Sequence, residues 1–109
     1  MPATQENNKM TKIQGLSSDQ LKKIVKSIHL HLQEAHIFAF GSRISGKPRK
    51  YSDLDIALDA HCPIDLSQLT KIKNSLSETN IPIVIDLVDY HSISNDFKAI
   101  IDKQKIELK

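Results

Sequence analysis

Two short motifs carry the side chains of this chain that are best suited to chemistry. The pair Gly41-Ser42 is followed, after ten residues, by Asp53-Leu54-Asp55. Glycine lets the backbone approach an anion closely, and the free N–H groups that open a helical turn attract phosphate. Two carboxylates at i and i+2 of a strand share one face, about 6.6 Å apart, and suit a divalent cation. Together the motifs indicate metal-assisted chemistry on a nucleoside triphosphate.

A third carboxylate, Asp86, interrupts the apolar run of residues 83–88. A charged residue in a buried strand requires a partner or a metal. If this strand lies beside the one carrying Asp53 and Asp55, the carboxylates repel, by about 4 kcal/mol for two unit charges at ~4 Å and an effective dielectric constant of ~20. Oxygen-only ligands and phosphate chemistry then favour Mg²⁺ or Mn²⁺ over Zn²⁺. Asp89 has the opposite parity to Asp86, so we leave it out of the site.

Each of these residues, taken alone, has a structural alternative. Asp53 could cap a turn, Asp55 could be an edge-strand charge, and Asp86 could be a salt-bridged strand residue. In the basic segment after the glycine, Arg43 could contact the triphosphate. Lys47, Arg49 and Lys50 could steer the triphosphate or could form a solvated loop. The combination of motifs favours the functional interpretation.

The elements that must position these residues follow from hydrophobic periodicity. We expect strands at 37–40, 53–58 and 81–88. We expect one helix from Ser17 or Ser18 to Glu34 or Ala35, a helical turn after Ser42, a second helix capped by Asp65 with Gln68 in a capping box, and a last helix capped by Ser94 or Asn95. The tail at 104–109 is expected to be a short strand or frayed. The order α-β-α-β-α-β-α predicts an α+β fold with a mixed sheet, covered by helices on one face.

Length and composition narrow the class of protein. A chain of 109 residues predicts one domain, which we place at 17–109 behind a polar N-terminal arm at 1–16. The net charge of +2 is too balanced to imply nucleic acid, and two Tyr, three Phe and no Trp offer no base-stacking platform. The single cysteine, Cys62, excludes an internal disulfide, and we expect it to be buried. Without a membrane-length apolar run or a signal-peptide pattern, we expect a cytoplasmic protein.

The motifs also resemble those of a known family. The matching residues are Phe40-Gly41-Ser42-Arg43, Gly46 and Ser52-Asp53-Leu54-Asp55-Ile56, with Asp86 in a later strand. They resemble the DNA polymerase β-like nucleotidyltransferase superfamily, and the short length resembles its minimal nucleotidyltransferases, the MNT domains. The resemblance runs from about residue 18 to residue 105. It implies a nucleotidyltransferase fold and transfer of a nucleoside monophosphate from a triphosphate to an acceptor hydroxyl, with release of pyrophosphate.

By matching positions, the resemblance implies a role for each motif. Gly41 and Ser42 would bind the triphosphate, Asp53 and Asp55 would bind the metals, and Asp86 would complete the metal site and help to activate the acceptor oxygen. The expected donor is ATP with Mg²⁺ or Mn²⁺. Many MNT proteins pair with a HEPN-domain toxin and act as its antitoxin, some by adenylylating a toxin tyrosine. A HEPN toxin is therefore the expected partner.

The chain departs from the family pattern in two places. Ile44 and Ser45 stand where the family often has a small residue and an arginine, which removes one cation. We expect no additional C-terminal domain of the kind that larger relatives carry, and we therefore expect the acceptor platform to come from a partner or a second copy of the chain. Two alternatives stay open: an antitoxin that neutralises a HEPN toxin by binding alone, and transfer to RNA or to a small-molecule hydroxyl.

Overall fold

The computed structural model describes residues 13, 15–45 and 53–109. The elements in chain order are α2 (Ser18–His29), β1 (His36–Phe40), α3 (Ser42–Ser45), β2 (Leu54–Asp59), α4 (Leu66–Ser77), β3 (Ile85–Asp89), a 3₁₀ turn (Tyr90–Ser92), α5 (Asn95–Gln104) and β4 (Ile106–Leu108). This order confirms the predicted alternation of helices and strands, and the tail forms the short strand β4.

The strands form one mixed sheet in the order β3-β2-β1-β4. β1 is antiparallel to both β2 and β4, whereas β2 and β3 are parallel. The mixed sheet is therefore confirmed. The condition set for Asp86 is also met, because its strand β3 is adjacent to β2.

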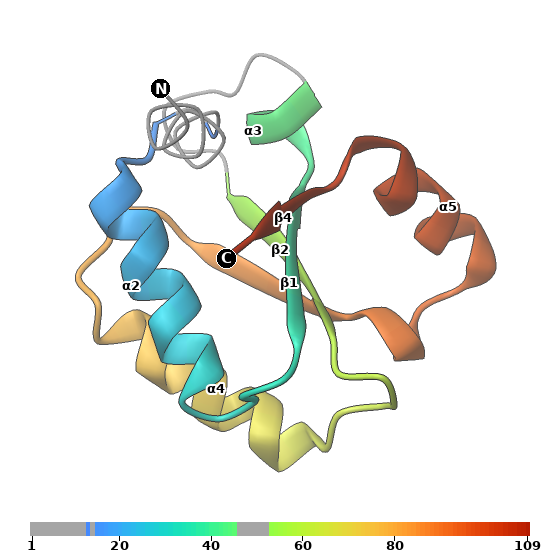
Figure 1. Ribbon diagram of the computed structural model, residues 1–109, viewed down its shortest axis with the longest axis horizontal. Helices are drawn as coiled ribbons and strands as arrows, with labels where there is room; N and C mark the ends of the chain where they lie inside the picture. The colour runs from blue at the N-terminus through green and yellow to red at the C-terminus, as the bar shows by residue number, and fades with distance from the viewer. Residues whose placement is uncertain (1–12, 14, 46–52) are drawn as a thin grey trace.

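Helices cover both faces of this sheet, so the prediction of one covered face is wrong. α2 and α4 pack on one face, over a core that includes Ile37, Ile56 and Leu87. α5 packs on the other face, where a second cluster joins Phe40, Ala57 and Ile101. Figure 1 shows the sheet between α2 and α4 on one side and α5 on the other. Alternation along the strands explains this, since both strand faces carry apolar residues.

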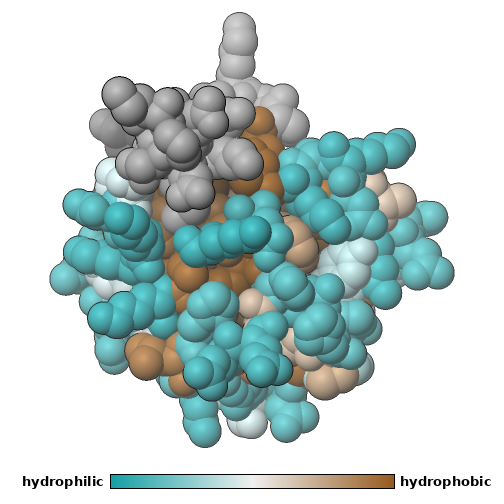
Figure 2. Space-filling view, viewed as in Figure 1, coloured by the Kyte–Doolittle hydropathy of each residue, from teal (hydrophilic) through white to brown (hydrophobic). Residues whose placement is uncertain are grey.

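The main core lies under α2 and α4. Its fully buried side chains come largely from α2, α4, β1 and β2 and include Leu21, Ile24, Ile28, Ile72, Ile37, Leu54, Ile56 and Leu58. On the outside, Figure 2 shows a mainly hydrophilic surface with a hydrophobic area near the centre of this view. No helix in the described ranges is long and apolar enough to cross a membrane.

The predicted polar arm at 1–16 lies mostly outside the described residues. Three of its members are described, and two of these belong to the main core: Ile13 is 1% exposed and Leu16 is 7% exposed. The packed part of the domain therefore includes Ile13 and Leu16. The predicted domain boundary between residues 16 and 17 stays a prediction, as does the polar arm at residues 1–12 and 14.

Two helix predictions need correction. α2 begins as predicted, with Ser17 and Gln20 in a capping box, but it ends at His29, because the chain turns there and the His29 ring bonds the carbonyl of Ala35 at 3.1 Å. α4 begins after Asp65, whose side chain makes no capping hydrogen bond. Gln68 instead donates to the backbone oxygen of His31 at 2.6 Å, so a tertiary contact replaces the expected capping box.

Two further predictions fail near strand ends. β3 begins at Ile85 rather than Ile81, and the preceding segment contains Pro82, which lacks an N–H for a strand ladder. The hydrogen bonding between the β3 segment and β2 begins where the Leu54 N–H donates to the backbone oxygen of Val84 at 2.9 Å. Cys62 is exposed rather than buried, because it lies in the connection between β2 and α4.

Candidate active site

The parallel pairing of β2 and β3 brings two of the predicted carboxylates side by side. Asp55 and Asp86 are direct partners in the register, and Asp55 also pairs with Phe40 of β1. Neighbouring strands lie about 4.8 Å apart, so two carboxylates at paired positions on one face are close neighbours. Asp53 immediately precedes β2 and has the same parity as Asp55. The sequence predicted the shared face, and the register supplies the neighbour relation.

These carboxylates lie on the face of the sheet that carries α5. Asp55 alternates with Leu54 and Ile56, which are buried under α2 and α4, and therefore faces the other way. Asp86 alternates in the same manner with Ile85 and Leu87. α5 covers this face further along, around Ala57 and Val88. The acidic end of the face is more open: Asp55 is half-buried, and Asp53 and Asp86 are exposed.

The electrostatics of Asp55 are dominated by burial and by neighbouring negative charge. Burial raises the pKa of the Asp55 carboxyl, and the nearby charges of Asp86 and Asp53 raise it further. Like charges concentrated in this way favour binding of a proton or a cation. Perturbed carboxylates of this kind are common at functional sites.

Gly41 follows the last residue of β1 and borders the acidic site. Its φ is +88°, a conformation that L side chains rarely adopt, and it lies directly against the Asp55 side chain. A Cβ at Gly41 would collide with Oδ2 of Asp55 and lie 3.2 Å from its Cγ. The Ile44 N–H donates to the Gly41 oxygen at 3.0 Å and begins the turn of α3. Only glycine satisfies both the backbone conformation and this close approach.

The residues after Gly41 divide between the surface and the interior. Ser42 is exposed at the start of α3, where its hydroxyl is accessible. Arg43 is only 3% exposed, and its guanidinium lies beside Gly15. Ile44 packs against the main core. The packing of Ile44 explains why an apolar residue stands where the family often has a small one. The burial of Arg43 is more typical of a residue that holds the loop than of one that contacts a ligand. Lys47, Arg49 and Lys50 lie outside the described residues.

One residue at this site carries no recognisable signal in the sequence. Gln104, the last residue of α5, accepts a hydrogen bond from the backbone N–H of Gly41 at 2.6 Å. The two residues are 63 positions apart in the chain. Periodicity assigns Gln104 only to the end of a helix, so sequence reasoning could not have connected it to the glycine.

The donor set fits a hard divalent cation. Three carboxylates belong to one end of a sheet face, and the raised pKa of Asp55 reflects the negative charge of the other two as well as burial. Among the described residues, however, no three His, Cys, Asp or Glu side chains form a ready-made metal cage. Mg²⁺ commonly uses only one or two protein carboxylates and completes its shell with water and substrate phosphates. The arrangement is therefore compatible with a metal that arrives together with a nucleotide.

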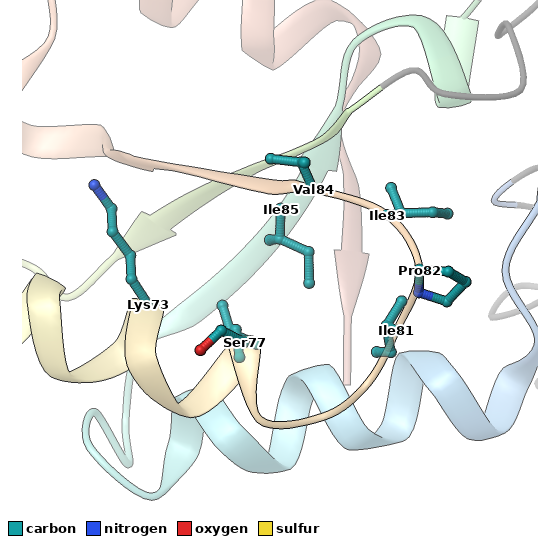
Figure 3. A pocket seen from close by; sticks show the side chains of 8 residues that line it. Lys73, Ser77, Ile81, Pro82, Ile83, Val84 and Ile85 are labelled. Atoms are coloured by element: carbon teal, nitrogen blue, oxygen red, sulfur yellow. The ribbon is translucent and has the colours of Figure 1, made fainter.

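Other polar groups of the fold have local structural tasks. Asp89 is 7% exposed, and its carboxylate accepts bonds from Ile64 N–H, His91 N–H and Ser92 Oγ at 2.7–3.1 Å. Its exclusion from the site agrees with these contacts. A pocket of about 450 Å³ lies between α4 and residues 81–85 (Figure 3). It opens on the α4 side of the sheet, opposite the face of Asp86, so it is separate from the acidic site.

A family model described as polymerase beta nucleotidyltransferase matches residues 19–109. The probable protein adenylyltransferase MntA of Haemophilus influenzae is 40% identical over 89 residues, which cover 81% of this chain and 77% of that protein. A putative protein adenylyltransferase of Methanocaldococcus jannaschii is 32% identical over 82 residues, covering 72% of this chain and 83% of the relative.

Two solved structures share the fold. A crystal structure of a toxin–antitoxin with AMP-PNP contains a chain that is 27% identical, with a TM-score of 0.68, over 82% of this chain and 72% of the other. A structure of a toxin–antitoxin MntA–HpeT mutant has a TM-score of 0.70 at 24% identity, with the same coverage, and supports the fold alone. The TM-scores show that both structures share the fold of this chain.

Proposed function

Because the chain belongs to the polymerase β nucleotidyltransferase family, we propose that it transfers AMP from ATP to a hydroxyl group of a partner protein. The observation that carries this proposal is the placement of Asp55 beside Asp86, directly against Gly41. A glycine-serine turn next to clustered carboxylates can hold both a triphosphate and the cation that accompanies it.

Each residue of the site has a role in this proposal. Gly41 and Ser42 bind the triphosphate, and Asp53, Asp55 and Asp86 hold Mg²⁺ or Mn²⁺. When bound, such an ion offsets the phosphate charge and stabilises the attacking and leaving oxygens of an in-line displacement. Arg43 supports the loop from the interior, since its buried guanidinium lies beside Gly15 rather than at the surface.

The reaction is a substitution at the α-phosphorus of ATP. The acceptor oxygen forms a new bond to this phosphorus while the bond to the bridging oxygen breaks, and pyrophosphate leaves. The acceptor hydroxyl loses its proton in the process. Asp86 is the proposed proton acceptor, because it is the exposed carboxylate on β3, at the edge of the described sheet.

The proposed acceptor is a toxin of the HEPN class, and the acceptor group is a tyrosine hydroxyl. Relatives named as protein adenylyltransferases and a fold neighbour solved as a toxin–antitoxin with AMP-PNP support a protein acceptor and a toxin partner. The HEPN class and the tyrosine are what the family resemblance implies. The small size of the domain agrees with this proposal, since a partner protein can supply the surface that orients the acceptor.

Transfer of radiolabel tests the reaction directly. The protein is incubated with Mg²⁺, the product of the neighbouring gene and ATP labelled at either the α- or the γ-phosphate. We expect label on the partner from α-labelled ATP only, and about a hundredfold less with Asp53→Ala. Asp65→Ala is the matched control, because Asp65 is exposed and makes no side-chain capping bond. Absence of α-label at every Mg²⁺ and Mn²⁺ concentration, or an Asp53→Ala variant as active as the wild type, contradicts the proposal.

Neutralisation by binding alone is the second candidate. It is favoured by the absence of a ready-made metal cage among the described residues and by the burial of Arg43. The double variant Asp53→Ala, Asp55→Ala separates the two functions. If it protects cells from the toxin as well as the wild type does, complex formation is sufficient and transfer is secondary.

A further inference from the structure

The end of α5 reaches the nucleotide loop through Gln104. The Oε1 atom of Gln104 accepts the N–H of Gly41 at 2.6 Å. The backbone register points to the same neighbour: Ala39 pairs with Ile106 in the β1–β4 ladder, so two further steps bring Gly41 opposite Gln104. A side-chain bond and the strand register thus independently place these residues together.

We propose that Gln104 is a positioning residue for nucleotide binding, which holds Gly41 in its φ +88° conformation against Asp55. This inference rests on the proposed role of the Gly41-Ser42 turn in binding the triphosphate. Glycine loses more conformational freedom on ordering than any other residue. A bond that orders Gly41 before the ligand arrives lowers the entropic cost of binding.

The end of α5, which carries Gln104, makes several contacts of its own. Lys105, next to Gln104, donates its backbone N–H to Ile101 at 2.8 Å, and its ammonium group bonds Asp102 at 2.9 Å. The same ammonium group lies 4.5 Å from the ring centre of Phe38 on β1. The carboxylate of Asp102 also accepts the Tyr90 hydroxyl at 3.0 Å. These contacts position the junction between α5 and β4. The side chain of Gln104 therefore bonds Gly41 from a backbone that is itself held in place.

Gly41 is therefore held between two strands. On the β2 side, the Asp55 carboxylate leaves no room for a side chain, and on the β4 side, Gln104 takes up the backbone N–H. The first contact sets how close the loop lies to the carboxylates, and the second sets which way the Gly41 peptide faces. Both are required to align a triphosphate with a metal at Asp55.

The test replaces Gln104 by methionine, which keeps the length but loses the acceptor. We expect the Kd and KM for ATP to rise about tenfold, the effect of losing one hydrogen bond, with kcat changed less than about twofold. The backbone amide of Gly41 should exchange hydrogen about tenfold faster. Gln68→Met is the matched control, because Gln68 also makes a 2.6 Å bond to backbone, far from the site. It should reproduce any loss of thermal stability without changing ATP affinity or Gly41 exchange.

Gln104→Glu supplies the second arm, because it keeps an acceptor oxygen at the same reach. Gly41 exchange stays slow in this variant, even though the added negative charge weakens ATP binding. The inference is overturned if Gln104→Met leaves Gly41 exchange or ATP affinity unchanged, or if Gln68→Met raises the KM equally. A wild-type protein that binds no ATP, while Gly41 exchange still responds to Gln104→Met, refutes the proposed function rather than the contact.

Discussion

Replacing Asp55 by asparagine should stabilise the ligand-free protein while abolishing transfer. The reason is that burial, Asp86 and Asp53 all disfavour a negative charge at Asp55. Asparagine keeps the shape of the side chain and removes the charge. A substitution that improves stability and destroys function identifies a group that the fold retains for its chemistry.

The magnitude follows from the strand pairing. Two unit charges on adjacent strands, at about 4.8 Å, repel by about 0.9 kcal/mol in water and about 3.5 kcal/mol at an effective dielectric constant of ~20. Because Asp86 is exposed and Asp55 only half-buried, solvent screening places the effect near the lower value. A gain of about 1 kcal/mol corresponds to a rise in Tm of about 4–8 °C for a domain of this size.

The sign of the pH dependence is determined by the raised pKa of Asp55. The folded state holds this proton more tightly than the unfolded state does, so wild-type stability falls as pH rises through the unfolded pKa of about 4 and then the folded pKa. Well below the pKa of the unfolded state, Asp55 is protonated in both states, so its charge no longer destabilises the folded protein. Asp55→Asn should therefore exceed the wild type in stability at about pH 7 and match it near pH ~3.

Thermal unfolding at these two pH values, with and without Mg²⁺ and a nonhydrolysable ATP analogue, measures the effect. The ligands should raise the Tm of the wild type more than that of Asp55→Asn. Asp65→Asn serves as the control, since it makes the same chemical change at an exposed position outside the acidic cluster. If Asp55→Asn is no more stable than the wild type at neutral pH, or equally stabilised in acid, the electrostatic argument is refuted.

Three further substitutions test the surrounding fold. Gly41→Ala should cost about 2 kcal/mol, because φ is +88° and the new Cβ meets Asp55, and calorimetry should detect no ATP binding. Asp59→Asn should lower stability at neutral pH, measured by urea unfolding. Burial raises the pKa of Asp59, but hydrogen bonds from His61 and His91 outweigh it and lower the pKa overall, so this contribution is present above about pH 4 and lost as pH falls through the folded pKa. Ser17→Ala should cost about 1 kcal/mol in the same assay, through loss of the capping bond to Gln20, and an unchanged midpoint would contradict that contact.

Hydrophobic and polar alternation was sufficient to predict most of the fold that matters for the site. It located the acidic strands, and the common parity of Asp53 and Asp55 predicted one face for both. Whether Asp86 joins them depended on a condition, that its strand be adjacent, which sequence alone could not settle. The parallel register of β2 and β3 meets that condition, with Asp55 paired to Asp86.

The failed capping box at Gln68 and the missed residue Gln104 share one physical cause, which is that tertiary contacts compete with local signals. Gln68 had the spacing of a capping box but bonds a backbone carbonyl of another segment. The contact of Arg43 with the triphosphate stays a prediction, and the structure places its side chain in the interior beside Gly15. Gln104 had no local signal, because its partner Gly41 is brought to it only by the β1–β4 pairing.

The site combines two kinds of constraint that respond to mutation in opposite ways. At Asp55, neighbouring negative charges are held together against their repulsion, so removing one of them should raise stability. At Gly41, the contact with Gln104 orders the chain, so removing it should lower ATP affinity with no gain in stability. Because the main core lies on the opposite face, under α2 and α4, it can support the electrostatic strain without contacting the ligand. The contrast between Asp55→Asn and Gln104→Met therefore distinguishes a residue kept for charge from a residue kept for position.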